Sequence, residues 1–170
     1  MKMSPTNKWN VVFLIDNVTP KKIAIFKRSP DKDFAPNMYT GVGGKIEKGE
    51  TVTESAYREL DEETGIKDVK LYEFARVNIH NKALWLYYFW GLYNKKNLPK
   101  SSDGILEWVS KEKILEKDIV PTTLALCREW EKRDFSTNSC FTVIEEEINW
   151  NDSKKIRITK VLEVKEGLID

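Results

Sequence analysis

The segment Gly43–Ile66, GGKIEKGETVTESAYRELDEETGI, constrains the fold of this chain more strongly than any other part of it. Thr51 and Glu54 have the spacing of a capping box, in which the two side chains satisfy backbone N–H groups at the start of a helix. Gly65 suits the left-handed position that follows the last helical turn. These signals predict a helix over residues 52–64.

Carboxylates are concentrated on one side of this predicted helix. At about 100° per residue, Glu59, Glu62 and Glu63 project in similar directions. Glu59 and Glu63 form an i, i+4 pair of like charges, which destabilises an isolated helix by roughly 0.2–0.5 kcal/mol. A solvated acidic face is one explanation. A site for a divalent cation is the other, because hard cations take carboxylate and carbonyl oxygens as ligands.

The glycines that precede the helix favour the cation site. Gly41, Gly43 and Gly44 lie in the run MYTGVGG, which predicts a glycine turn, and Gly49 comes just before the helix. Glycine allows positive φ and a close approach of the backbone to a ligand. A glycine turn beside a carboxylate cluster therefore predicts a site for a hard cation that shares phosphate oxygens with a substrate.

The complete spacing of residues 44–66 resembles the Nudix box. That pattern is glycine, five residues, glutamate, seven residues, then arginine, glutamate, an aliphatic residue, any residue, two glutamates, any residue, glycine and an aliphatic residue. Gly44, Glu50 and residues 58–66 match every defined position, a coincidence of about 10⁻⁹ at average residue usage. The resemblance implies an α/β (α+β) fold, the Nudix α/β/α sandwich with a mixed β-sheet between helices.

In Nudix hydrolases this helix carries the metal ligands. The resemblance implies that Glu59, Glu62, Glu63 and the carbonyl of Gly43 hold one to three Mg²⁺ or Mn²⁺ ions. The family hydrolyses a nucleoside diphosphate linked to another group. Bound metals neutralise the diphosphate and lower the pKa of a water molecule, and an ionised carboxylate then takes its proton.

The remaining catalytic roles follow from the same resemblance. Arg58 would orient a carboxylate through charge-assisted hydrogen bonds, and Glu50 would support that network. The carboxylate that acts as general base varies within the family, and Glu59, Glu63 and Asp103 are the candidates. Asp103 stands in a loop where related enzymes carry a further acidic residue that reaches toward the metals.

The wider chain resembles the MutT-like branch, the 8-oxo-dGTP diphosphatases that remove oxidised nucleotides from the nucleotide pool. We therefore expect a nucleoside triphosphate, such as 8-oxo-dGTP, to be cleaved to the monophosphate and pyrophosphate. The substrate-binding candidates are Arg28, Phe34, Thr40, Gly44 and Lys45. Thr40 stands where some of those enzymes carry an asparagine, and its single hydroxyl cannot make the bidentate contact of an amide.

Two alternatives stay open beside this expectation. The first is another Nudix substrate, such as an ADP-sugar, a dinucleotide polyphosphate or a capped RNA end. The second is a non-catalytic Nudix module that senses nucleotides. Modules of that kind usually have a degraded box, whereas Arg58, Glu59, Glu62 and Glu63 are all present in this chain. Turnover that depends on Mg²⁺ distinguishes the enzyme from the sensor.

Length and composition predict one domain over residues 1–170, with a strand-rich extension from about 138 to 170. The net charge is +1, so neither a nucleic-acid polymer nor a membrane is expected as a partner. Two cysteines are too few for a disulfide scaffold, and the first residues lack the apolar core of a signal peptide, so we expect a cytoplasmic protein. A monomer and a homodimer are both compatible with the sequence.

Apolar and alternating runs complete the expected secondary structure. Helices are expected over 111–117 and 121–133 as well as 52–64, and strands over 9–16, 22–28, 70–79, 84–93, 106–109, 140–148 and 155–164. The last two strands predict a hairpin that packs on the sheet or pairs with a second subunit. Within this hairpin, Glu145–Glu147 is expected to be a run of charges at a strand edge.

Overall fold

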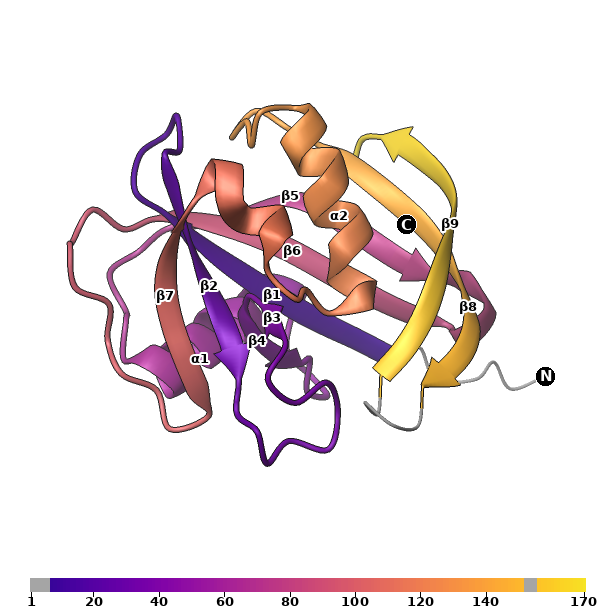
Figure 1. Cartoon of the computed structure of the whole chain (residues 1–170), viewed down its shortest axis with the longest axis horizontal. Helices are drawn as coiled ribbons and strands as arrows, with labels where there is room; N and C mark the ends of the chain where they lie inside the picture. Colours follow the sequence, from indigo (N-terminus) through magenta and orange to yellow (C-terminus); the bar gives the residue numbers. More distant parts are fainter. Residues whose placement is uncertain (1–6, 152–155) are drawn as a thin grey trace.

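The computed structural model describes residues 7–151 and 156–170, in which nine strands form one sheet between two α-helices (Figure 1). The strands are β1 (Asn7–Ile15), β2 (Lys22–Arg28), β3 (Tyr39–Thr40), β4 (Val42–Lys45), β5 (Leu71–Ile79), β6 (Leu84–Leu92), β7 (Gly104–Ser110), β8 (Phe141–Asn151) and β9 (Ile156–Glu166). The helices are α1 (Val52–Thr64) and α2 (Pro121–Lys132), with 3₁₀ turns η1 (His80–Lys82) and η2 (Lys111–Glu116).

The sheet is mixed, as expected. Its main path runs β3-β2-β1-β6-β5-β8-β9, while β4 pairs with β1 and β7 pairs with β2. The pairs β1–β6 and β5–β8 are parallel, whereas the other pairs of named strands are antiparallel. The pairing of β2 with β7 brings Arg28 opposite Gly104, so Asp103 lies next to a strand that is distant in sequence.

Each face of the sheet has its own hydrophobic core, because β1 is buried on both sides. Phe13 and Ile15 point to one face and pack in the cluster that contains Trp130 of α2. Val12 and Leu14 point to the other face and pack in the cluster that contains Leu60 of α1. The two helices therefore cover opposite faces of the sheet (Figure 1), which confirms the predicted α/β/α sandwich.

The ends of α1 confirm the local signals in the sequence. The hydroxyl of Thr51 accepts the backbone N–H of Glu54 at 3.0 Å. Gly65 has φ 75°, and its N–H donates to the carbonyl of Asp61 at 2.7 Å. The helix runs from residue 52 to residue 64, because the capping threonine and the left-handed glycine determine its two ends.

The predicted glycine turn was wrong, because Gly43 and Gly44 belong to β4. Gly43 pairs with Val11 and Gly44 pairs with Asn10 of β1. A Cβ atom on Gly43 would lie 2.0 Å from the carbonyl oxygen of Asn10, and one on Gly44 would lie 2.5 Å from a carboxylate oxygen of Glu59. These glycines are therefore needed for close approach between β4, β1 and α1, whereas positive φ occurs at Gly49.

The C-terminal strands extend the sheet of the same chain. β8 lies parallel to β5, with Val77 opposite Val143, and β9 pairs antiparallel with β8. The structure thus places the hairpin on the sheet, the first of the two predicted arrangements. Position 155, where the last strand was expected to begin, lies outside the described residues. The helix expected over 111–117 is the 3₁₀ turn η2.

The expectation that Glu145–Glu147 lies at a strand edge was wrong, because β8 lies between β5 and β9 in the sheet. The burial of Glu145 follows from this position. Its side chain is fully buried in β8, while Glu146 and Glu147 are half-buried. Burial raises the pKa of the Glu145 carboxyl to about 8, because an ionised carboxylate loses its hydration inside the protein. Glu145 lies opposite Ile79 of β5, and the Glu147 side chain, two residues further along the strand, is also only 10% exposed. The run of three identical residues conceals this alternation.

Replacing Glu145 by Gln is expected to change how stability depends on pH. The carboxyl has a pKa near 4.5 when unfolded and about 8 when folded, so only the unfolded state loses the proton between these values. Its contribution to stability is complete below pH 4.5 and is lost as the pH rises toward 8, by up to about 1.4 kcal/mol per pH unit. In denaturant unfolding between pH 5 and pH 8, the free energy of unfolding should decrease less steeply with pH for Glu145→Gln than for the unmodified chain.

Glu146→Gln is the matched control for that experiment, since Glu146 is the next residue of the same strand and is only half-buried. For Glu146→Gln, the free energy of unfolding should decrease with pH as steeply as it does for the unmodified chain. If Glu145→Gln and Glu146→Gln decline in parallel, the buried carboxyl does not make the predicted contribution.

Candidate active site

Arg58 organises three of the box carboxylates. Its Nε and Nη2 donate to the two oxygens of Glu50 at 2.9 and 2.7 Å. Its Nη1 donates to Glu59 at 3.0 Å and to Glu62 at 3.1 Å. The hydrogen bonds from Arg58 lower the pKa of the Glu50 carboxyl to about 2. The guanidinium therefore keeps Glu50 ionised and holds Glu59 and Glu62 on one side of α1.

Glu59 lies against the glycine strand. Its carboxylate occupies the space where a side chain on Gly44 would be, and only 14% of its side chain is exposed. Burial raises the pKa of Glu59, while the hydrogen bond and the charge of Arg58 oppose that change. The carboxylate is thus fixed between α1 and β4 by a glycine on one side and an arginine on the other.

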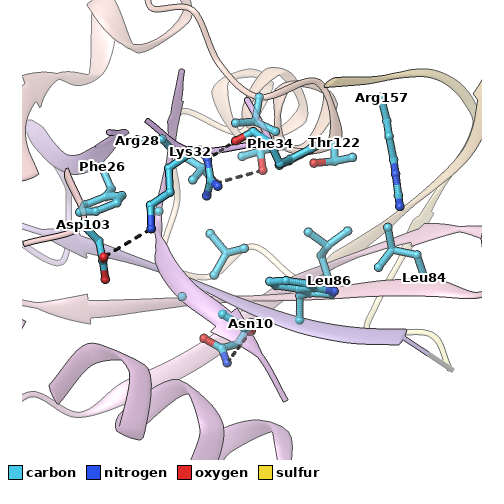
Figure 2. Close-up of a pocket in the computed structure, with 18 of the residues that line it drawn as sticks. Asn10, Phe26, Arg28, Lys32, Phe34, Leu84, Leu86, Asp103, Thr122 and Arg157 are labelled. Atoms are coloured by element: carbon cyan, nitrogen blue, oxygen red, sulfur yellow. Dashed lines mark hydrogen bonds and ion pairs between the residues drawn. The ribbon is translucent and has the colours of Figure 1, made fainter. Parts of the chain in front are cut away.

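Glu63 is one of the residues that line a cavity of about 380 Å³, and Figure 2 shows most of this lining. The Oε2 atom of Glu63 is buried and has no hydrogen-bond partner among residues 7–151 and 156–170. Burial raises the pKa of Glu63 to about 7, and the negative charges of Glu59 and Asp103 contribute to the increase. A buried carboxylate oxygen without a partner is uncommon in proteins and needs a specific explanation.

The cavity has an acidic end and an apolar end. Asp103 and Lys32 lie at the acidic end with Glu63, and Lys32 Nζ contacts Asp103 Oδ1 at 3.3 Å. Leu84 and Leu86 of β6 lie at the other end (Figure 2). A ligand with a charged group and an apolar group would therefore have a defined orientation in this cavity.

The middle of the cavity contains most of the predicted substrate-binding side chains. Phe34 and Thr40 line it, and Arg28 Nε donates to the carbonyl of Phe34 at 2.8 Å. The Thr40 hydroxyl lies 3.3 Å from that of Thr123, which in turn lies 2.9 Å from the buried hydroxyl of Tyr88. This chain of hydroxyls gives the cavity wall groups that both donate and accept hydrogen bonds.

Five of the predicted site residues lie outside the cavity lining, namely Glu50, Arg58, Glu59, Glu62 and Lys45. Lys45 is exposed at the end of β4, and its backbone carbonyl accepts from Arg58 at 3.3 Å. The Glu62 side chain is 59% exposed and reaches the cluster through Arg58. Gly43 and Gly44 of β4 line the cavity, as does Glu63. The other carboxylates of the box lie next to these residues, outside the cavity lining.

Asn10 is a cavity residue that the sequence reasoning missed. It is 1% exposed, and its Nδ2 donates to Ser55 Oγ at 2.6 Å and to the Gly44 carbonyl at 3.2 Å. Its Oδ1 is buried without a partner beside Gly43. A polar residue at the start of the apolar run VVFLI was the available signal. Lys32 and Arg157 also line the cavity and were not predicted. The sequence around these two charged residues carries no comparable signal.

The oxygen atoms at the acidic end fit a hard divalent cation that arrives with its substrate. Among the described residues, no three His, Cys, Asp or Glu side chains converge closely enough to hold an ion alone. Buried oxygens of Glu63 and Asn10 nevertheless lack partners, and Glu59 is packed on the glycine strand. Mg²⁺ is usually bound by one or two carboxylates, with waters and substrate phosphates completing its coordination.

A mixed sheet between two helices, with an arginine–glutamate helix beside a glycine strand, is the arrangement that defines Nudix proteins. The sequence profile of the NUDIX domain matches residues 7–128. The chain therefore belongs to the Nudix family, whose hydrolases act on pyrophosphate bonds and generally use divalent metals such as Mg²⁺. No helix in the two described stretches combines the length and apolar character needed to cross a membrane.

Known proteins similar to this chain include two curated relatives and a solved structure. The uncharacterized Nudix hydrolase YfcD of Escherichia coli is 29% identical over 120 residues, which is 66% of each chain. The m7GpppN-mRNA hydrolase NUDT17 of Xenopus laevis is 37% identical over 57 residues, 34% of this chain but 19% of that protein. The MutT protein of Bacillus halodurans superposes with a TM-score of 0.62 at 18% identity, covering 94% of this chain and 96% of its own.

Proposed function

We propose that the chain is a metal-dependent pyrophosphohydrolase that cleaves a nucleoside triphosphate, an oxidised purine such as 8-oxo-dGTP, to the monophosphate and pyrophosphate. The observation that carries this proposal is the unpartnered, buried oxygen of Glu63 at the acidic end of a cavity large enough for a nucleotide. The box carboxylates would hold the phosphates through a cation at this end, and the base would enter the apolar part of the cavity.

The proposed cation ligands are Glu59, Glu62, Glu63 and the carbonyl of Gly43. A bound Mg²⁺ or Mn²⁺ supplies positive charge for the diphosphate and lowers the pKa of a coordinated water. Arg58 acts as a positioning residue, because it holds Glu59 and Glu62 at fixed distances and is itself fixed by the bidentate contact with Glu50.

Glu63 is the favoured general base among the three candidates. Asp103 is paired with Lys32, and Glu59 accepts from Arg58, whereas Glu63 keeps one buried oxygen without a partner in the part of the chain that the structure describes. A cation bound nearby would favour the ionised form of this carboxyl, which is the form that a general base needs. Lys32 at the same end and Arg28 in the middle of the cavity, which interacts electrostatically with Glu63 and Asp103, would provide positive charge for the phosphates.

The base would be recognised beside Phe34, Thr40 and Thr123. Phe34 offers a ring for stacking, and the two hydroxyls offer hydrogen bonds to the edge of a purine. The hydroxyls of Thr40 and Thr123 are 3.3 Å apart, so a hydrogen bond from the base to Thr40 would extend to Thr123. The MutT likeness, at 18% identity, shows the fold alone, and the choice of an oxidised purine therefore depends on these cavity residues.

The experiment for this proposal is a substrate panel in Mg²⁺ with 8-oxo-dGTP, dGTP, the other deoxynucleoside triphosphates, ADP-ribose, diadenosine polyphosphates and a capped RNA end. We expect pyrophosphate release to be fastest with 8-oxo-dGTP. Faster turnover of ADP-ribose, a dinucleotide or the cap would keep Nudix chemistry and reject the proposed substrate. Binding of nucleotides without turnover of any of them would indicate a sensing module.

A further inference from the structure

The C-terminal hairpin contributes a charged side chain to the cavity. Arg157 of β9 lines the cavity, although β9 lies beyond residues 7–128 that match the family profile. Ile156, its neighbour, is 5% exposed and packs in a cluster with Ala35 and Met38 of the loop that carries Phe34. The hairpin is thereby attached to a wall of the cavity, which places Arg157 at a defined position.

Arg157 lies at the apolar end of the cavity, far from the carboxylates. Figure 2 shows its side chain extending toward Leu84 and Leu86, at the opposite end from Lys32 and Asp103. Trp9 of β1 also lines the cavity, and its indole N–H donates to Asn7 Oδ1 at 3.1 Å. This end therefore combines aliphatic side chains, an indole ring and a guanidinium.

Arg157 forms an ion pair on the hairpin. Its Nε lies 3.7 Å from Glu147 Oε1, and Glu147 Oε2 also lies 3.5 Å from Lys82 Nζ, so two cations share this carboxylate. The ion pair helps to fix the position of the guanidinium at the apolar end of the cavity. The planar face of the guanidinium stacks well on an aromatic ring, which is the property that distinguishes arginine from lysine.

We propose that Arg157 and Trp9 form a site for an uncharged, planar nucleobase, so that the C-terminal hairpin determines which substrates the enzyme accepts. This inference rests on the proposed function, which places the phosphates at the acidic end. One edge of the base lies beside Phe34 and Thr40. The opposite edge, which is farther from the phosphates, lies against the indole of Trp9 and the guanidinium of Arg157. Arg157 is a specificity residue in this arrangement and takes no part in the hydrolytic step.

The test compares substrates with and without a base in the full chain. Arg157→Ala should lower kcat/KM for 8-oxo-dGTP by about three- to thirty-fold, the range expected for one guanidinium–ring contact. Hydrolysis of deoxyribose 5-triphosphate, which has no base, should be unchanged. Arg157→Lys should behave like Arg157→Ala, because lysine keeps the positive charge but lacks the planar guanidinium group. Lys160→Ala, an exposed cation on the same strand, should match the unmodified protein with both substrates.

Three results would overturn the inference: an equal loss for both substrates, full activity of Arg157→Lys, or no loss in Arg157→Ala. The first two would indicate a structural or an electrostatic role. Calorimetric titration with 8-oxo-dGMP separates this inference from the proposed function. If the unmodified chain hydrolyses no nucleotide, the proposed function fails, while weaker 8-oxo-dGMP binding by Arg157→Ala would still support the base site and unchanged binding would reject it.

Discussion

Glu63→Gln is expected to lower kcat for nucleotide hydrolysis by about a thousandfold, within the range of 10²–10⁴ for a lost general base. Glutamine has nearly the same volume, so it preserves packing at the end of α1. It removes the negative charge that the cation requires and the oxygen that would accept the proton from water. Since none of the described residues forms a hydrogen bond with Glu63 Oε2, the substitution breaks no hydrogen bond at this atom and the fold should be retained.

Asp61→Asn is the matched control for Glu63→Gln. Asp61 lies two residues earlier on the same helix, is 44% exposed, and has only a 4.0 Å contact with Lys67. Steady-state kinetics in saturating Mg²⁺, with circular dichroism to check folding, should show a large loss for Glu63→Gln and none for Asp61→Asn. Losses of similar size in the two variants would reject Glu63 as the reacting carboxylate.

Arg58→Ala has the second-largest expected effect, a decrease of about 100-fold in kcat/KM, which is typical when a residue that orients metal ligands is removed. The substitution removes the guanidinium of Arg58, which contacts Glu50, Glu59 and Glu62. The like charges would then separate, and Glu59 would leave its position against Gly44. The concentration of Mg²⁺ needed for half-maximal activity should therefore increase.

Arg58→Lys tests whether the geometry or the charge of Arg58 matters. Lysine restores a positive charge but cannot make the bidentate contact with Glu50 while also contacting Glu59. We expect an activity between those of the arginine and alanine forms, with a Mg²⁺ requirement that is still increased. A lysine variant with normal Mg²⁺ dependence would show that charge alone is sufficient.

The parts of the fold that the sequence predicted are those with local causes. The α1 boundaries follow from Thr51 and Gly65, and β1 is recognisable because both of its faces are apolar. β4 was missed because its glycines suggest a turn, and the sequence does not show that Asn10 and Glu59 occupy the space beside them. The burial of Glu145 depends on the parallel pairing of β8 with β5, which no local pattern reveals.

In the candidate site, too, the residues with a local pattern could be predicted and those placed by tertiary structure could not. Glu59, Glu62 and Glu63 could be grouped from the helical period alone. Asp103 reaches the site through the pairing of β7 with β2, and its place was inferred only from the resemblance. Arg157 could not be predicted, because its position in the cavity results from a hairpin that is remote in sequence and attached by tertiary packing.

The central claim is that this cavity hydrolyses a phosphoanhydride bond with a divalent cation. The most direct measurement is the rate of pyrophosphate release from 8-oxo-dGTP by the metal-free protein before and after addition of Mg²⁺, with Glu63→Gln measured in parallel. We expect no turnover in EDTA, full turnover in Mg²⁺, and almost none in Glu63→Gln under either condition. Turnover that is equal in EDTA and Mg²⁺, or that survives in Glu63→Gln, would contradict the central claim.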